Sequence, residues 1–334
     1  MSAVRDGGPP RLAVVIPTRD RRAILAETLS RMGRYAASEP IEVVVIDDGS
    51  RDDTGDAVRE FAARAPWNVR LEDGGGRGPA AARNLGTRAA SAPACLYVGD
   101  DSLPAPSLIA GHLRFHAQHP DEADALLGLV VPAPPLDHSP FIRWLHEEGT
   151  QFGYGALEGG GQVPASCFWT SNVSAKRELV LGVGGFDEGF LGAACEDAEL
   201  GFRLARAGMR LHYDPGTVSM HFHPTDLAQT LERMRGVGVA YRRLCELAPE
   251  ISAPPRPALR HRVKAAALTV GMLAGHPAWA RTASWRFLCD EVQREAYWGS
   301  DDDTEAPRIG RRLARLAVAD PLSNPPPAPR PLPA

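Results

Sequence analysis

Two pairs of aspartates each follow a run of apolar residues that is typical of a buried strand. Asp47 and Asp48 lie in the stretch IEVVVIDDGS, and Asp100 and Asp101 lie in the stretch ACLYVGDDS. A carboxylate at the end of a buried strand is costly unless it meets a cation or a polar ligand. Because the carboxyl ends of strands also form the ligand-binding edge of open α/β sheets, the pairs indicate one site for a metal ion and a phosphorylated ligand.

A purely structural role accounts for one pair more easily than for the other. Asp48 and Ser50 could simply cap the turn that follows their strand. The second pair follows Gly99, which lets the backbone approach a ligand closely, and has no basic neighbour in sequence. Hard divalent cations prefer carboxylate oxygens and leave room for substrate phosphates, so Asp100 and Asp101 are the better candidates for a metal site.

A third acidic group begins a predicted helix in the stretch EDAELGFRLARAG. Glu196 and Asp197 lie in its first turn, where the helix dipole favours ionised carboxylates. An ionised carboxylate in a pocket can act as a general base. Glu199 and Arg203 have the spacing of an i,i+4 surface pair, so we interpret Glu199 as structural and Asp197 as the candidate base.

Two groups of histidines have spacings that could serve a metal ion. His221 and His223 would share one face of a strand, because the side-chain period of a strand is two. Either imidazole could be a ligand, and a partly buried structural role accounts equally well for His223. His112, His116 and His119 have helical spacing, which predicts the polar face of an amphipathic helix.

The elements that must position these residues alternate between strands and helices over the first 130 residues, which implies a parallel, doubly wound sheet. The predicted strands of this part are 12–17, 42–47, 69–71, 94–98 and 125–131, and the helices are 21–35, a helix from about 50, 79–90 and 106–119. Residues 132–161 read as irregular. Beyond them we expect helices at 175–181 and 196–207, strands at 210–213 and 217–222, and helices from 227 onward.

The bulk composition excludes several classes of protein. The chain has 334 residues, 44% apolar content and a net charge of −4, which argues against an extended nucleic-acid footprint. Its five cysteines include no C-x-x-C pair, which favours a reducing cytosol. The amino-terminal ten residues do not resemble a signal peptide, so we expect a cytoplasmic protein. The apolar run 265–275 is too short to span a bilayer, which leaves a peripheral contact at the inner face of the membrane open.

Two loops bear on the choice of ligand. The glycine-rich loop 74–78, which precedes Arg83 and Asn84, could admit a phosphate or a base but lacks the P-loop pattern. The first strand continues as VIPTRD, without the G-x-G-x-x-G of dinucleotide-binding folds. These features argue against a dinucleotide-dependent dehydrogenase.

Taken together, the motifs resemble those of the family 2 inverting glycosyltransferases. Seven parts occur in the family's order over residues 11–235, namely VVIPTRDR, VIDDGSRDDT, GPAAARNLGTRAA, YVGDDS, SNVSAKRELVLGVGGFDEGF, EDAELGFRLARAG and the late histidine. Each part is weak alone, but their order is strong support. The resemblance implies an α/β fold of the GT-A type, with a doubly wound, mostly parallel sheet flanked by helices and a carboxyl-terminal helical extension.

The resemblance also implies roles in binding a nucleotide-sugar donor. Asp48 would bond the nucleobase edge, Arg83 would lie near the base or the phosphates, and Asp100 would approach the ribose. Many members have three consecutive aspartates where this chain has Gly99 followed by two. The nucleoside pocket would be lined by Pro17, Thr18 and Arg19.

For the metal and the chemistry, the resemblance again assigns individual positions. Asp101, in the DXD-like motif, would bind Mg²⁺ or Mn²⁺ that bridges the donor diphosphate. His221 would complete the metal site, with His223 as the alternative. Asp197 would be the catalytic base, with Glu196 beside it contacting the acceptor. The sugar or the acceptor would be bordered by Trp169 and Asn172.

The resemblance divides the chain into four segments: a flexible amino terminus, the GT-A domain, a helical extension and a Pro-rich disordered tail. The corresponding ranges are 1–10, 11–235 (a nucleotide-binding half, 11–131, and an acceptor and catalytic half, 132–235), 236–319 and 320–334. We expect the irregular 132–161 region and the carboxyl-terminal helices to bind the acceptor. The Arg-rich stretches 256–264 and 308–315 could dock on anionic lipid or an acidic partner, or could simply be solvated helix faces.

The expected activity is metal-dependent, inverting transfer of a hexose from a nucleotide sugar, with UDP as the expected nucleotide. The acceptor hydroxyl could belong to a carbohydrate, a lipid-linked molecule, a small molecule or a peptide. One alternative is a sugar-phosphate nucleotidyltransferase, which would carry a glycine- and lysine-rich loop where this chain has Pro17, Thr18 and Arg19. The other is a non-catalytic carbohydrate-binding protein on the same fold.

Overall fold

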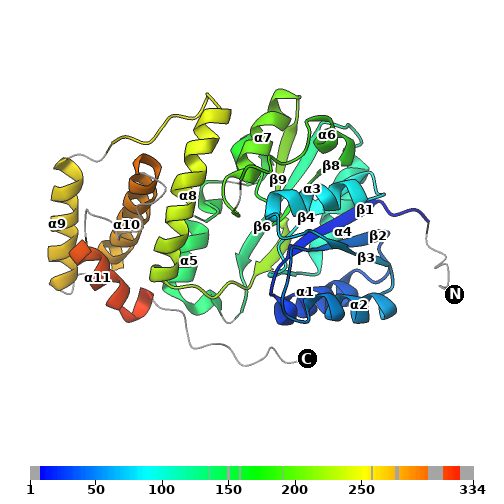
Figure 1. Ribbon diagram of the computed structural model, residues 1–334, viewed down its shortest axis with the longest axis horizontal. Helices are drawn as coiled ribbons and strands as arrows, with labels where there is room; N and C mark the ends of the chain where they lie inside the picture. Colours follow the sequence, from blue (N-terminus) through cyan, green and yellow to red (C-terminus); the bar gives the residue numbers. More distant parts are fainter. Residues whose placement is uncertain are drawn as a thin grey trace. The chain divides into compact units, whose positions relative to one another are not determined.

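The computed structural model describes residues 8–134, 136–148, 151–157, 159–190, 192–256, 259–274, 278–299 and 311–323 (Figure 1). These residues form two compact units. The first unit runs to Ala133 and includes Leu157–Phe222, and the second contains Pro134–Ala156 and the chain from His223 onward. The two units therefore divide the predicted 132–235 half between them. Of the predicted flexible ends, residues 1–7 and 324–334 lie outside the described residues.

The first unit is built on one sheet that has nine strands among the described residues. Its order is β3-β2-β1-β4-β8-β6-β9-β5, with β7 added to β9. The parallel strands of the amino-terminal half are β1 (Leu12–Thr18), β2 (Ile41–Asp47), β3 (Asn68–Asp73) and β4 (Ala94–Tyr97). The others are β5 (Ser102–Pro104), β6 (Asp124–Pro132), β7 (Gly161–Gln162), β8 (Val173–Lys176) and β9 (Arg210–His221). Because β6 and β9 are also parallel, the predicted mostly parallel sheet is confirmed.

Helices cover both faces of this sheet, as a doubly wound fold requires. One face packs against α1 (Arg22–Tyr35), α2 (Thr54–Arg64) and α4 (Ser107–Gln118), and its core joins Val14, Val43 and Leu96 to Leu25 and Leu29 of α1. The other face packs against α3 (Pro79–Ala89), which Figure 1 shows on the opposite side from α1 and α2. A Cβ at Gly86 of α3 would clash with Val15 and Ile46, so glycine is what lets this helix approach the strands.

Two predictions for the second half of this unit are wrong. The segment from Ala175, predicted as a helix, begins inside strand β8, and helix α6 (Arg177–Gly182) starts only after it. All four residues of β8 are buried between β4 and β6, and helical periodicity cannot identify so short a buried strand. The predicted strands at 210–213 and 217–222 form one strand, β9, whose pairing with β6 is irregular after Gly128.

The prediction that the histidines of α4 form a polar face in solvent is also wrong, because these side chains pack inward. His112 is fully buried, and its ring nitrogens bond Ser174 Oγ at 2.7 Å and Asn172 Oδ1 at 2.8 Å. His116 bonds the same Ser174 Oγ at 2.8 Å. Burial lowers the pKa of His112 to about 4, so this ring is neutral at pH 7. These histidines satisfy buried polar groups of β8 and of the turn before it.

The second unit is helical in the residues described. It contains α5 (Pro140–Glu147), α8 (Leu227–Leu247), α9 (Leu259–Leu273), α10 (Ala278–Trp298), α11 (Arg311–Ala319) and the short 3₁₀ helices η1 (Leu136–His138), η2 (Tyr154–Ala156) and η4 (Pro321–Ser323). Trp285 centres its core, with ring centroids 5.1 Å from Phe141 and 5.5 Å from Trp144. Over the described helices, no stretch has both the length and the apolarity needed to cross a membrane.

Helix α5 falls in the segment predicted to be irregular. Ser139 caps its amino end through a hydrogen bond from the Ile142 N–H at 3.4 Å, and Pro140 occupies the first turn, where its missing N–H is harmless. At the other end of the unit, Trp285 Nε1 donates to Ser323 Oγ at 2.8 Å. The first residues of the predicted tail are therefore part of the packed unit.

Candidate functional site

The carboxyl end of β2 is closed by its two aspartates, which have different partners. Asp47 Oδ1 accepts the Ser50 N–H at 2.8 Å and so caps the turn. Asp48 is buried, and its two oxygens accept the N–H groups of Arg77 at 2.8 Å and Gly78 at 2.9 Å. Asp48 thus ties the glycine-rich loop to the sheet edge. Each carboxylate oxygen has a second lone pair, so Asp48 can still accept a hydrogen bond from a ligand.

Asp100 is held between the first strand and the first helix. Thr18 Oγ1 donates to Asp100 Oδ2 at 2.8 Å, and Thr28 Oγ1 donates to the Asp100 carbonyl at 2.7 Å. Burial and the neighbouring charge of Asp101 raise the pKa of Asp100 to about 6, although Arg21 and Thr18 oppose the shift. The structure therefore places Asp100 beside Thr18. Of the other two residues predicted for the nucleoside pocket, Pro17 is half-buried and Arg19 is exposed.

Asp101 meets His221 at the edge where β5 pairs with β9. Ser102 is the register partner of His221, and the Phe222 N–H donates to the Asp101 carbonyl at 2.9 Å. His221 Nε2 lies 3.5 Å from Asp101 Oδ1. A carboxylate and an imidazole at this separation could bind one Mg²⁺ or Mn²⁺ ion from the same side. His223 follows two residues later, where the second unit begins.

Arg21 is a residue of this site that the sequence interpretation missed. Its Nη1 lies 3.3 Å from Asp101 Oδ2, the oxygen that does not face His221. The signal was the last arginine of the VVIPTRDR motif.

Gly99 also bears on the position of Asp101, because a Cβ at Gly99 would lie 2.9 Å from Asp101 Oδ1. Glycine at this position, where many members have aspartate, therefore gives the Asp101 carboxylate the space it occupies.

A buried ion pair joins α3 to α7 (Glu196–Arg206). Arg83 Nη1 lies 2.7 Å from Glu196 Oε1, and both side chains are buried. Burial and the charge of Asp197 raise the pKa of Glu196 to about 7, although Arg83 opposes the shift. Among the described residues, Arg83 Nε and Glu196 Oε2 are buried without a hydrogen-bond partner. Arg83 was predicted to lie near the nucleobase or the phosphates of the donor. Its observed partner is Glu196, the carboxylate next to Asp197, the candidate general base.

Asp197 differs from Glu196 in being only partly buried. Its Oδ1 accepts the Ala198 N–H at 2.8 Å, and its Oδ2 accepts the Thr170 N–H at 3.4 Å. The preceding residue, Cys195, has φ +66°, which is uncommon for a residue other than glycine and marks stored backbone strain. Helix α7 thus begins at a strained turn that buries Glu196 and leaves Asp197 partly accessible.

The backbone that holds Asp197 comes from the segment before β8. A Cβ at Gly201 would clash with the Ala165 carbonyl, so glycine allows α7 to pack closely on η3 (Ala165–Cys167). Trp169, in the same segment, is half-buried. Asn172 is fully buried, and its Nδ2 donates to the carbonyls of Leu129 and Thr217, each at 3.0 Å. Asn172 therefore holds β6 and β9 together in this structure.

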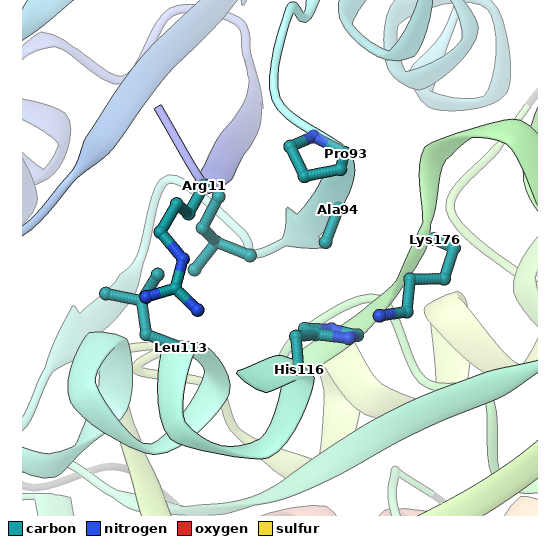
Figure 2. Close-up of a pocket in the computed structure, with 7 residues that line it drawn as sticks. Arg11, Pro93, Ala94, Leu113, His116 and Lys176 are labelled. Atoms are coloured by element: carbon teal, nitrogen blue, oxygen red, sulfur yellow. The ribbon is translucent and has the colours of Figure 1, made fainter. Parts of the chain in front are cut away.

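A small cavity lies at the opposite edge of the sheet from the aspartates. It measures about 70 Å³ and opens at Arg11 and Pro93, which precede β1 and β4. Figure 2 shows His116 and Lys176 close to each other on one side and Arg11 on another. Lys176 Nζ donates to the His119 carbonyl at 3.0 Å, and burial followed by the Lys176 charge lowers the pKa of His116 to about 3. This cavity is separate from the acidic edge and is not a candidate for the donor site.

Comparison with known sequences agrees with this architecture. Residues 13–134 match the family model of glycosyl transferase family 2. Validoxylamine A glucosyltransferase of Streptomyces hygroscopicus subsp. jinggangensis is 35% identical over 236 residues, which are 63% of this chain and 54% of that protein. The chain spans about half the length of the first curated relatives it matches.

Solved structures share the fold at low sequence identity. Mannosyltransferase PcManGT from Pyrobaculum calidifontis, in complex with GDP-Man and Mn²⁺, is 20% identical with a TM-score of 0.55, over 86% of this chain and 87% of that one. S. aureus TarS 1–349, in complex with UDP-GlcNAc, is 16% identical with a TM-score of 0.51, over 86% and 90%. The fold is therefore that of the GT-A glycosyltransferases, as predicted. Together with the match of residues 13–134 to the family model, these likenesses support a family 2 glycosyltransferase.

Proposed function

We propose that this chain catalyses metal-dependent transfer of a hexose from a nucleotide sugar to a hydroxyl acceptor, with inversion at the anomeric carbon. The observation that carries the proposal is the acidic sheet edge of the first unit. Asp100 is bonded to Thr18, and the adjacent Asp101 lies 3.5 Å from His221. A carboxylate–imidazole pair beside a strand-end carboxylate suits a divalent cation and a diphosphate.

For the donor, we propose a UDP-sugar held at the ends of β1, β2 and β4. The oxygens of Asp48 already order the glycine-rich loop, so a nucleobase would bind against a loop that is already in place. Asp100 would take the ribose, and Arg19, which is exposed, has the freedom to move onto the nucleotide. Pro17 and Thr18 would complete the pocket. The neighbours in complex with GDP-Man and with UDP-GlcNAc support a nucleotide-sugar donor.

For the metal, we propose that Asp101 and His221 hold Mg²⁺ or Mn²⁺, with His223 as the alternative imidazole. When bound, the cation would offset the negative charge that develops on the leaving diphosphate. Arg21 also contacts Asp101, at 3.3 Å, and would orient the carboxylate before a cation binds. The neighbour in complex with Mn²⁺ and GDP-Man supports a metal at this fold's donor site.

For the chemistry, we propose Asp197 as the general base. Its carboxylate takes the proton of the acceptor hydroxyl while that oxygen forms a bond to the anomeric carbon. The bond from this carbon to the diphosphate oxygen breaks on the opposite face, which inverts the configuration. Glu196 and Arg83, joined at 2.7 Å, would fix the first turn of α7. Because they position Asp197, we propose a supporting role for both.

On the acceptor side, we propose that Trp169 borders the sugar or the acceptor, since it is half-buried and lies close in sequence to Thr170, whose N–H contacts Asp197. Asn172 would act indirectly through its bonds to β6 and β9. The relative named for validoxylamine A supports a small-molecule hydroxyl acceptor and a glucosyl donor.

A panel of nucleotide sugars with Mn²⁺ tests the reaction class. The proposal predicts slow, metal-dependent release of a nucleoside diphosphate even without acceptor, with UDP-glucose as the first donor to try. Formation of pyrophosphate from a nucleoside triphosphate and a sugar phosphate would instead identify a nucleotidyltransferase. Donor binding without turnover, over a full acceptor panel, would identify a binding protein.

A further inference from the structure

The second unit carries an unusual apolar stripe on helix α9. Leu259, Val263, Val270 and Leu273 are 73%, 62%, 65% and 54% exposed. They are spaced four, seven and three residues apart. At 100° per residue they fall within an arc of about 80° on one side of the helix. Contiguous apolar side chains exposed in this way mark an interaction surface more often than scattered ones do.

The opposite side of α9 is packed, so the exposure belongs to a docked helix. His261, Ala265 and Leu268 are buried there, and the helix contacts α10 and α11. His261 Nδ1 lies 3.6 Å from Glu291 Oε1, and Lys264 Nζ lies 5.5 Å from the centre of the Phe287 ring on α10. Helix α9 therefore has one side fixed to its own unit and one apolar side available to a partner.

The charged residues within the α9 segment itself have a single sign. Arg256, Arg260, Arg262 and Lys264 fall in the stretch 256–274, which contains no Asp or Glu, although the whole chain carries a net charge of −4. On the helical projection Arg260 and Arg262 lie on the two sides of the stripe. Long basic side chains beside an apolar stripe can reach up to anionic headgroups while the apolar groups insert.

An exposed tryptophan lies at the start of the helix that follows α9. Trp279, in the first turn of α10, is 64% exposed. Tryptophan is favoured at membrane interfaces because its ring is apolar and its N–H is polar. A second copy of the chain is a poorer occupant, because a contact of α9 with itself would bring two basic surfaces of like charge together.

We infer that the exposed side of α9 is a docking surface for the headgroup region of an anionic lipid membrane. Leu259, Val263, Val270 and Leu273 enter the boundary between headgroups and acyl chains, and Arg260 and Arg262 bind the lipid phosphates. The inference does not depend on the proposed activity. It gives the open question of a peripheral membrane contact a specific surface.

Flotation of the full chain with vesicles tests this surface. The chain should float with vesicles of phosphatidylcholine containing 30% phosphatidylglycerol, and at least tenfold less with phosphatidylcholine alone or in 0.5 M NaCl. Val263→Glu combined with Val270→Glu should lower binding at least tenfold. Val239→Glu, at a position 44% exposed on α8, is the matched control and should bind as the wild type does. Both positions on α9 are exposed, so circular dichroism and thermal melting should show both variants folded.

Charge variants separate the electrostatic part. Arg260→Gln combined with Arg262→Gln should weaken binding to the anionic vesicles about tenfold, whereas Arg64→Gln on α2 should not. Equal binding to neutral and anionic vesicles, or unchanged binding of both α9 variants, would overturn the inference. Light scattering after size exclusion tests for a second copy of the chain as the occupant. A dimer that the Val270→Glu substitution dissociates would show that a second copy, not lipid, covers the stripe.

Discussion

The acidic edge of the first unit and the α9 surface of the second differ in how their charged groups are used. At the acidic edge nearly every carboxylate has a near partner, such as Thr18 for Asp100 and Arg21 for Asp101. On α9 the basic groups flank exposed Leu and Val side chains. The first arrangement suits one small ligand, and the second suits a broad, fluid surface. A change at one region should therefore leave the function of the other intact.

The largest effect is expected from Asp197→Asn. Loss of the general base should lower sugar transfer about 10³-fold, while UDP binding and vesicle flotation stay unchanged, because the amide keeps the shape of the side chain. Initial rates with UDP-glucose and calorimetric titration with UDP measure the two quantities. Asp56→Asn, on the exposed surface of α2, is the matched control. Turnover of Asp197→Asn within tenfold of the wild type would remove this residue from the base role.

Metal binding should fail next. Asp101→Asn would remove the charged ligand proposed for the cation, and with it charge stabilisation at the leaving diphosphate, so the rate should fall about 100-fold. His221→Ala should raise the Mn²⁺ concentration for half-maximal rate more than His223→Ala does. The reverse order would make His223 the ligand. Removal of the cation with EDTA should abolish turnover of the wild type, and Mn²⁺ should restore it.

Stability should respond most to the buried ion pair. Arg83→Met leaves Glu196 buried without its cation, and breaking such a pair costs about 3–5 kcal/mol of unfolding free energy. Urea unfolding followed by circular dichroism measures the loss. Arg88→Met, near the end of the same helix, is the matched control, because it makes the same change of residue type but removes no buried ion pair. A loss below about 1 kcal/mol for Arg83→Met would mean that the pair does not hold α7.

The smallest effect is a change in pH dependence. Burial and Asp197 raise the folded-state pKa of Glu196 from 4.5 to about 7. The folded state then binds more protons than the unfolded state between those values, so stability falls as pH rises from about 4.5 to 7. Glu196→Gln should flatten this part of the profile, with Arg83 and Asp197 unchanged. Urea midpoints at pH 5, 6 and 7 measure the slope, and an unchanged slope would show that Glu196 is not its source.

Local signals made the acidic edge of the sheet predictable from the sequence. The strands ending at Asp47 and near Asp100 are apolar runs closed by acids, and parallel strands must bring such ends to one edge. The helix beginning at Glu196 was predictable because its first turn is acidic and its apolar residues have helical spacing. For these elements, local pattern and long-range packing favour the same structure.

Partners distant in sequence could not be predicted in this way. Arg83 and Glu196 are 113 positions apart, and no local pattern indicates that they meet. The buried histidines of α4 were misread because periodicity does not distinguish a polar face in water from one that bonds Ser174 and Asn172. For α9 the sequence offered only an Arg-rich stretch and a short apolar run, and the exposure of its Leu and Val side chains is what shows that an apolar side faces outward.

The stereochemistry of donor hydrolysis tests the central claim most directly, because it needs no acceptor. Wild-type chain, UDP-glucose and Mn²⁺ would be followed by proton NMR, with Asp197→Asn in parallel. Inversion of the α-linked donor predicts that β-glucose appears first, together with UDP, and that the Asp197→Asn sample shows far less of both. Initial release of α-glucose, or release that is independent of both Mn²⁺ and Asp197, would contradict the account.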